Sequence, residues 1–239
     1  MAHAVFKYRK GEAYPWVYKY PQTALTADCI VFSFSPDGKE SPLKVLLIKR
    51  GADPYKDYWA FPGGFVNPDE TAEQGAVREL QEETGLQAPY LEQIEVFSTP
   101  NRDPRQRVVT VPFIVLTRDV NAVAADDAAE AKWFSVDDLP SLAFDHKEIF
   151  EKAMEALRKS LVFNPLWRFL LPEEFTMSQL QTLYEAVYCK KYDRRNFARK
   201  MLSTGYLNDG GLNRTNLPSR HPTVYTFRSS INEKINQSL

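Results

Sequence analysis

Residues 64–86 read Gly-Phe-Val-Asn-Pro-Asp-Glu-Thr-Ala-Glu-Gln-Gly-Ala-Val-Arg-Glu-Leu-Gln-Glu-Glu-Thr-Gly-Leu, and this stretch predicts one short helix with its own start and stop signals. Thr71, followed three residues later by Gln74, is typical of a capping box at the beginning of a helix. Gly85 stands where a left-handed residue ends such a helix. We therefore expect a helix over about residues 72–84.

The predicted helix gathers acidic side chains on one face. Glu79 lies three residues before Glu82 and four before Glu83, and both spacings bring side chains together on a helix. Carboxylates this close repel one another, and a hard cation such as Mg²⁺, which takes oxygen ligands and bridges to phosphates, neutralises them. The alternative is an exposed acidic helix face, which does not account for the fixed offsets of Gly64 and Glu70.

The stretch resembles the Nudix box, Gly-x5-Glu-x7-Arg-Glu-U-x-Glu-Glu-x-Gly-U with U aliphatic, and every defining position matches. The resemblance implies a site for Mg²⁺ or Mn²⁺ at which an activated water attacks a diphosphate. It assigns the metal to Gly64 (through its carbonyl), Glu79, Glu82 and Glu83. It assigns catalysis to Glu70, Arg78, Glu82 and Glu83, with Glu70 and Arg78 orienting the other carboxylates.

The composition is that of an ordinary globular protein. The 239 residues are 44% hydrophobic and 13% aromatic, enough for packed cores in one large domain or two small ones. Neither a run of about 18 apolar residues nor a secretory signal is present, so we expect a cytoplasmic protein without a membrane partner. Cys29 and Cys189 lack metal-type spacing and are expected to be apolar fillers rather than a disulfide.

Charge is distributed unevenly along the chain, although the formal net charge is −1. Residues 1–160 hold 19 Lys and Arg against 25 Asp and Glu, a net charge of −6. Residues 161–239 hold 11 against 6, a net charge of +5. Two parts with different partners are the simplest explanation.

The first part alternates strand-like and helical patterns. Strands are predicted at 23–34, 44–50, 94–98, 108–116 and 131–135, the first two as a hairpin, with 59–66 leading into the box helix. Residues 145–159 have helical periodicity, with Ile149, Phe150, Ala153, Met154 and Leu157 on one side. This order predicts an α+β chain that begins with a mixed sheet sandwiched by helices, and the resemblance implies that this part is a Nudix α/β/α sandwich.

The second part predicts a winged helix-turn-helix. A helix over 179–188, capped by Thr176 or Ser178, buries Leu180, Leu183, Tyr184 and Val187. A second helix over 194–203, ended by Gly205, packs through Phe197, Met201 and Leu202, and a polar loop then leads to a strand at 223–227. The domain boundary is expected near 160–164, giving domains at 1–160 and 161–239.

The second of these helices carries a basic face. An exposed cationic face is often only solvated, but this one stands where helix-turn-helix proteins place base-reading side chains. Arg and Asn read guanine and adenine edges, and further cations contact phosphates. The predicted DNA-binding residues are Arg194, Arg195, Asn196, Arg199, Lys200, Arg214, Arg220 and His221.

The whole arrangement is similar to the Nudix-related transcriptional regulators of NAD metabolism, the NrtR family. The resemblance rests on the box and on residues 175–188, Phe-Thr-Met-Ser-Gln-Leu-Gln-Thr-Leu-Tyr-Glu-Ala-Val-Tyr, followed by Asp-Arg-Arg-Asn-Phe at 193–197. It implies a homodimer that binds a palindromic operator in double-stranded DNA, represses NAD biosynthesis or salvage genes, and responds to ADP-ribose. The alternative is a Mg²⁺-dependent ADP-ribose pyrophosphatase, yielding AMP and ribose 5-phosphate, with an interaction domain at its carboxy terminus.

Residues 98–109, Ser-Thr-Pro-Asn-Arg-Asp-Pro-Arg-Gln-Arg-Val-Val, resemble a loop of one branch of ADP-ribose pyrophosphatases, with Gln106 in place of a common glycine. Guanidinium groups pair well with diphosphate oxygens, although an exposed basic loop is the alternative. The predicted ligand-binding residues are Arg50, Arg102, Arg105 and Arg107. His146, in the similar segment 142–146, is expected to be a structural residue at a helix start rather than a catalyst.

Overall fold

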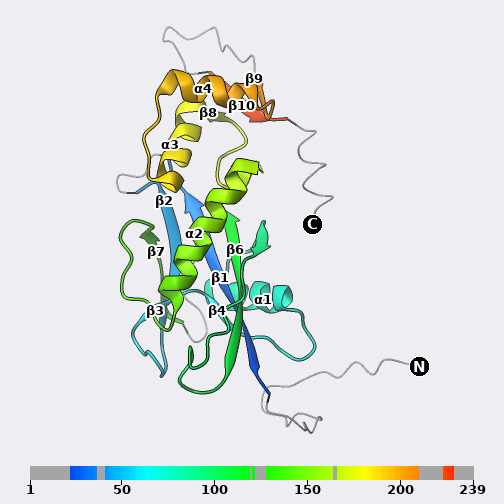
Figure 1. Cartoon of the computed structure of the whole chain (residues 1–239), viewed down its shortest axis with the longest axis vertical. Helices are drawn as coiled ribbons and strands as arrows, with labels where there is room; N and C mark the ends of the chain where they lie inside the picture. Colours follow the sequence, from blue (N-terminus) through cyan, green and yellow to red (C-terminus); the bar gives the residue numbers. More distant parts are fainter. Residues whose placement is uncertain are drawn as a thin grey trace, which may run out of the picture.

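A computed structural model describes residues 22–36, 41–118, 120–121, 128–163, 166–209 and 223–228 (Figure 1). Most of its strands form one mixed sheet with the order β3-β2-β1-β6-β5. β1 (Ala24–Phe34) is antiparallel to β2 (Leu43–Arg50) and parallel to β6 (Val108–Thr117). β3 (Trp59–Ala60) and β7 (Ala128–Ser135) pair with β2, β4 (Gly63–Phe65) pairs with β1, and β5 (Leu91–Gln93) pairs with β6.

Helices cover both faces of this sheet because β1 and β2 are apolar on both faces. Cys29 and Val31 belong to the core under α1 (Ala72–Thr84), which includes Leu80. Ile30 and Phe32 point to the opposite core, which contains the buried stripe of α2 (His146–Phe163). Successive strand residues thus enter different cores, and the predicted α/β/α sandwich is confirmed.

α1 has the bounds that its sequence predicts. The Thr71 hydroxyl accepts the Gln74 N–H, the Gln74 side chain accepts the Thr71 N–H, and Gly85 ends the helix with φ 71°. These contacts satisfy backbone donors that a helix start otherwise leaves unpaired. The box helix is therefore positioned by signals within the box itself.

α2 extends the predicted helix by one turn, to Phe163. The side chains of Ile149, Ala153, Met154 and Leu157 are buried, and Phe150 packs partly buried against the same core. Figure 1 shows α2 running along the sheet and reaching the elements at the other end of the molecule.

The carboxy-terminal elements have the order of a winged helix. They are η1 (Leu166–Phe169), β8 (Phe175–Thr176), α3 (Met177–Tyr188), α4 (Arg194–Ser203), β9 (Leu207–Asp209) and β10 (Val224–Phe227). The three strands form a second sheet, β8-β10-β9. Thr176, rather than Ser178, caps α3, with Gln179 completing a capping box. The helix, helix and strand order predicted for this part is confirmed.

One apolar core joins the two parts of the chain. It includes Phe34 of β1, Leu161 of α2, Trp167 of η1 and Leu183 of α3, all with 6% exposure or less. The predicted boundary at 160–164 coincides with the last turn of α2 rather than with an open linker, and the division of the chain into 1–160 and 161–239 stays a prediction.

Three local predictions were wrong. The strand expected at 94–98 lies earlier in the chain, as β5 (Leu91–Gln93), and of the expected range only Phe97 forms a bridge to β6, at Thr110. Leu202 is 46% exposed, since the packed face of α4 is filled by Phe197 and Met201. Cys189 is an exposed left-handed cap of α3 and not an apolar filler, whereas Cys29 is buried; both are free thiols.

No helix within the described residues is both long enough and apolar enough to span a membrane.

Candidate functional site

Arg78 lies at the centre of the acidic residues of the box. Its Nε and Nη2 donate to the two carboxylate oxygens of Glu70 at 3.0 and 2.6 Å, and its Nη1 donates to Glu79 at 2.8 Å and Glu82 at 3.0 Å. Hydrogen bonds from Arg78, with one from the Asn67 N–H at 2.7 Å, hold the pKa of Glu70 below its usual range. The orienting roles predicted for Glu70 and Arg78 correspond to these contacts.

Glu83 faces the sheet and not Arg78. Its Oε2 accepts the Gly63 N–H at 2.8 Å. Burial, and next the negative charges of Glu79 and Asp28, raise the pKa of Glu83 to about 8. Burial also raises the pKa of Glu79. A bound cation would stabilise the ionised form of both carboxylates.

The donors of this site suit Mg²⁺ or Mn²⁺ in kind, because they are carboxylate and carbonyl oxygens. Gly64 packs directly against Glu79, and a Cβ atom at this position would overlap the Glu79 carboxylate. As they stand, however, no three acidic, histidine or cysteine side chains in the described part of the chain form a metal-binding group, and Glu79 and Glu82 share Arg78 Nη1. A cation held by Glu79 and Glu82 together would compete with Arg78 Nη1 for their oxygens, and Glu82 has a side chain that is 47% exposed.

Two of the four predicted ligand-binding arginines lie together beside the acidic residues. The guanidinium carbon of Arg50 lies 4.9 Å from the ring centre of Phe144, and that of Arg105 lies 5.8 Å from the same ring. Burial, and next the charge of Arg105, lower the pKa of Arg50. Arg50 donates to the backbone oxygens of Pro54 and Ala52, and no carboxylate among the described residues forms an ion pair with it. The pair provides an incompletely neutralised positive charge suited to a phosphate group.

The other two arginines are used differently. Arg102 has a side chain that is 5% exposed and donates through Nε and Nη2 to Asp145 at 2.8 and 2.6 Å. Arg107 donates to the Thr99 carbonyl at 3.3 Å. Arg102 is therefore engaged in a buried ion pair, while Arg107 lies on the exposed side of the same loop.

His146 is a buried structural residue in this arrangement. Its Nδ1 accepts the Phe61 N–H at 3.0 Å, and its ring stacks on Phe61 with a centroid distance of 5.1 Å. Burial lowers the pKa of His146, which favours the neutral acceptor. These contacts fix the start of α2 against the segment between β3 and β4.

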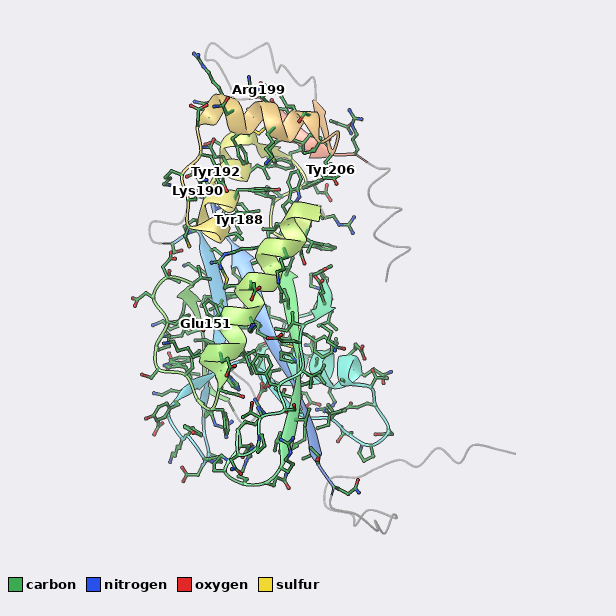
Figure 2. The ribbon with its side chains drawn as sticks, in the orientation of Figure 1. Glu151, Tyr188, Lys190, Tyr192, Arg199 and Tyr206 are labelled. Carbon is green, nitrogen blue, oxygen red and sulfur yellow. The ribbon has the colours of Figure 1, made fainter. Side chains whose placement is uncertain are left out.

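Five of the eight predicted DNA-binding residues lie on α4, at the far end of the molecule from α1 (Figures 1 and 2). Arg194, Arg195, Asn196, Arg199 and Lys200 are all exposed, while Phe197 and Met201 turn inward. Arg199 Nη2 donates to Asn196 Oδ1 at 2.6 Å. The Asp193 side chain caps the helix through the Asn196 N–H at 2.9 Å. Arg214, Arg220 and His221 lie outside the described residues.

Three residues of the site were not predicted. Asp145 is the partner of Arg102, Phe144 lies beneath Arg50 and Arg105, and Asp28 is buried in β1 next to Glu83. Asp28 had a signal in the sequence, since it is an acidic residue inside an apolar strand. Phe144 and Asp145 lie in the segment 142–146 that resembles ADP-ribose pyrophosphatases, but their roles depend on partners distant in sequence.

Two family models match the chain. A NUDIX domain matches residues 24–154, and an NrtR DNA-binding winged helix domain matches residues 168–227. The fold and the site thus define a Nudix protein with a winged helix attached at its carboxy-terminal side.

Comparison with known proteins refines this class. An ADPR responsive transcriptional repressor of Acinetobacter baylyi is 32% identical over 198 residues, covering 80% of this chain and 76% of the relative. An ADP-ribose pyrophosphatase of Methanocaldococcus jannaschii is 45% identical over 115 residues, covering 48% of this chain and 68% of the relative. The chain belongs to the Nudix proteins and, among them, to the NrtR family.

Two solved structures of Shewanella oneidensis NrtR are similar to this chain. One is its complex with a 27mer DNA, at 31% identity, with a TM-score of 0.67 and coverage of 85% of this chain and 93% of that one. The other is its NUDIX domain with ADP ribose, at 33% identity, with a TM-score of 0.52 and coverage of 58% and 90%.

Proposed function

We propose that this chain is an ADP-ribose-responsive transcriptional repressor. Residues 1–160 act as the effector domain that binds ADP-ribose, and residues 161–239 bind double-stranded DNA. The protein works where its operator is, in the cytoplasm, as a homodimer on a palindromic site that controls NAD biosynthesis or salvage genes. The relatives that bind DNA and ADP-ribose support the regulatory role, while the dimer, the operator and the target genes are our proposals.

The exposed polar and cationic face of α4 is the observation that carries this proposal. The five predicted DNA-reading side chains on α4 do not contribute to the core, because the core contacts of this helix come from Phe197 and Met201. The capped helix presents them together, as base and phosphate recognition requires. In the effector domain, Arg50 and Arg105 lie together near Phe144 and form a cationic site that suits a diphosphate.

The test is fluorescence anisotropy of a labelled duplex carrying the palindrome upstream of the host's NAD-salvage genes. Mg²⁺ is omitted and salt is fixed, because phosphate contacts make the affinity strongly salt-dependent. We expect sequence-selective binding that ADP-ribose shifts. R195A is expected to weaken binding by about 1–3 kcal/mol if Arg195 reads a base, whereas the control S178A, at an exposed position of α3, keeps the cationic face. Equal affinity for operator and scrambled duplexes would refute the repressor proposal.

Hydrolysis of ADP-ribose is a second candidate function, favoured by the complete box and the pyrophosphatase relative. Mg²⁺ or Mn²⁺, bound by Glu79, Glu82, Glu83 and the Gly64 carbonyl, would supply charge neutralisation and an activated water. Arg78 and Glu70 would hold the carboxylates, and Arg50 and Arg105 would orient the diphosphate. Water attack on one phosphorus, with cleavage of the bridging P–O bond, would give AMP and ribose 5-phosphate.

AMP release measured with Mg²⁺, with Mn²⁺ and without either metal tests this second candidate. E83Q keeps an oxygen that can accept the Gly63 N–H but removes a charged metal ligand. If the protein hydrolyses ADP-ribose, we expect E83Q to abolish AMP release and leave DNA binding of the ligand-free protein unchanged. Wild-type protein that releases no AMP with either metal would eliminate the enzymatic function and leave the regulatory one.

A further inference from the structure

α2 connects the loop beside the proposed ligand site to the first helix of the winged helix. A buried ion pair connects the start of α2 to the loop, and hydrogen bonds to backbone oxygens connect the end of α2 to α3. A helix of 18 residues spans about 27 Å at 1.5 Å per residue. Such a helix moves as one piece when either end is displaced.

The first end is held by the Arg102–Asp145 ion pair. Asp145 directly precedes α2, and its carbonyl accepts the N–H groups of Glu148 and Ile149 at 2.9 and 3.1 Å. Two nitrogens of Arg102 donate to the Asp145 carboxylate, and this bidentate contact fixes both the distance between the two side chains and their relative orientation. Any displacement of Arg102 is therefore passed to the first turn of α2.

The loop that carries Arg102 also carries Arg105, a proposed phosphate contact. Arg105 is held by Asp103 through its backbone N–H at 2.9 Å and its Nη2 at 2.6 Å. A diphosphate competes with Asp103 for this guanidinium, because both offer anionic oxygens to the same donors. Ligand binding at Arg105 thus acts on a loop that is fastened to α2 only three residues away.

Three hydrogen bonds join the carboxy-terminal end of α2 to α3, one donated by α2 and two donated by α3. Arg158 Nε donates to the Val187 carbonyl at 2.8 Å, and the Tyr188 hydroxyl donates to the Arg158 carbonyl at 2.7 Å. The Tyr184 hydroxyl donates to the Leu161 carbonyl at 3.2 Å. Figure 2 shows Tyr188 at the end of α3 nearest the sheet.

α3 in turn positions the start of α4. The Tyr192 carbonyl accepts from Gln181 Nε2 at 2.9 Å, and the Tyr192 N–H donates to Glu185 Oε1 at 3.1 Å. Asp193, the next residue, caps α4. A shift of α3 therefore reaches the helix that carries the predicted DNA-reading residues.

We propose that α2 carries the ligand signal to α4, with the Arg102–Asp145 ion pair as its input contact and the hydrogen bonds of Arg158, Tyr184 and Tyr188 as its output contact. This inference rests on the proposed function, since it names how that function is regulated. It requires the two contacts to act in series, so that breaking either one uncouples the two binding sites.

The experiment measures the coupling factor, which is the ratio of operator dissociation constants with and without saturating ADP-ribose. The input variant is D145N, and the output variant is Y184F/Y188F, which loses two hydroxyl donors and keeps both rings. K159A is the matched control, because the Lys159–Glu155 pair lies exposed on the same helix and faces neither contact. Circular dichroism melting of each variant checks that it is folded, and the tyrosine variant carries the test if D145N is not.

We expect a wild-type factor of about 5–150, typical of allosteric coupling, and a fall of at least about threefold in each variant, with K159A unchanged. The coupling factor of the combined D145N/Y184F/Y188F variant is expected to be no lower than the smaller of the two factors measured for D145N and for Y184F/Y188F. Retention of the wild-type factor in both variants, or reductions that multiply in the combined variant, would overturn the inference alone. A wild-type factor of 1 would instead overturn the proposed function itself, before any variant is considered.

Discussion

Arg78 explains why the box needs a guanidinium at this position. One planar fork contacts the carboxylates of Glu70, Glu79 and Glu82 and also donates to the Phe65 carbonyl at 3.1 Å. A lysine ammonium presents a compact charge without this fork geometry and could not hold several fixed acceptors in one plane. The side chain therefore keeps an otherwise repulsive acidic cluster in order when no cation is bound.

Gly64 lies so close to Glu79 that a side chain at this position would displace the Glu79 carboxylate. We expect G64A to lower the free energy of unfolding by no more than about 1 kcal/mol, the low end for overpacking, because the added methyl group displaces only the carboxylate at the end of the Glu79 side chain. We also expect it to weaken Mn²⁺ binding in isothermal titration, since Glu79 is a predicted ligand. The control is G85A, which has open space around it but a φ of 71°. Backbone strain in G85A should cost about 1–2 kcal/mol and leave Mn²⁺ binding intact. Wild-type affinity in G64A would contradict the metal assignment.

His146 gives a pH-dependent prediction. Because burial lowers its folded-state pKa, the unfolded chain takes up a proton first as the pH falls below the ordinary value of 6.5. The stability that neutral His146 contributes is therefore complete above about pH 6.5 and is lost as the pH falls toward the folded pKa, by at most about 1.4 kcal/mol per pH unit. We expect H146N, which retains an acceptor for the Phe61 N–H, to lack this part of the pH dependence in urea unfolding at pH 7.5 and 5.5.

H146A separates the hydrogen bond from the titration. It leaves the buried Phe61 N–H without its acceptor, so we expect a loss of about 1–3 kcal/mol at pH 7.5 that H146N largely avoids. If the wild type and H146N lost stability in parallel between pH 7.5 and 5.5, another group would be responsible for the acid sensitivity.

At the scale of elements, the sequence predicts best what is decided locally. The bounds of α1 follow from Thr71, Gln74 and Gly85, which lie in or beside that helix, and the structure has the same bounds. The use of Arg102 was not predictable in this way, since its partner Asp145 is 43 residues away. Four arginines near one loop look alike in sequence, and only the tertiary fold distinguishes the buried ion pair from the pair over Phe144.

The two capping boxes give a matched pair of predictions for α1 and α3. T71A and T176A each remove a hydroxyl that accepts the N–H of the residue three positions on, at 3.2 Å in both helices. We expect each to lower the free energy of unfolding by about 1 kcal/mol. T71S and T176S keep the oxygen and serve as controls that should lose much less. Chemical denaturation measures all four, and an alanine variant as stable as its serine counterpart would argue against the capping contribution.

On the scale of the whole molecule, the acidic and basic parts of the chain serve different ends of one body. Residues 1–160 carry −6 and residues 161–239 carry +5, and the exposed cations of α4 lie at the end far from α1. DNA is therefore attracted to one end and repelled by the rest, which orients the encounter without any base contact. Rigid attachment of the two ends is what allows a ligand at one to influence the other.

The shared apolar core should make the two parts of the chain unfold cooperatively. Because Phe34, Leu161, Trp167 and Leu183 belong to one continuous core, neither part can unfold without exposing apolar surface of the other. We therefore expect a single unfolding transition, with far-UV circular dichroism and tryptophan fluorescence coinciding. T71A and T176A, which act in different parts, should then shift this one transition by similar amounts. Two separate transitions, each moved by only one of the variants, would show that the parts unfold independently and that α2 joins two bodies by its hydrogen bonds rather than by a common core.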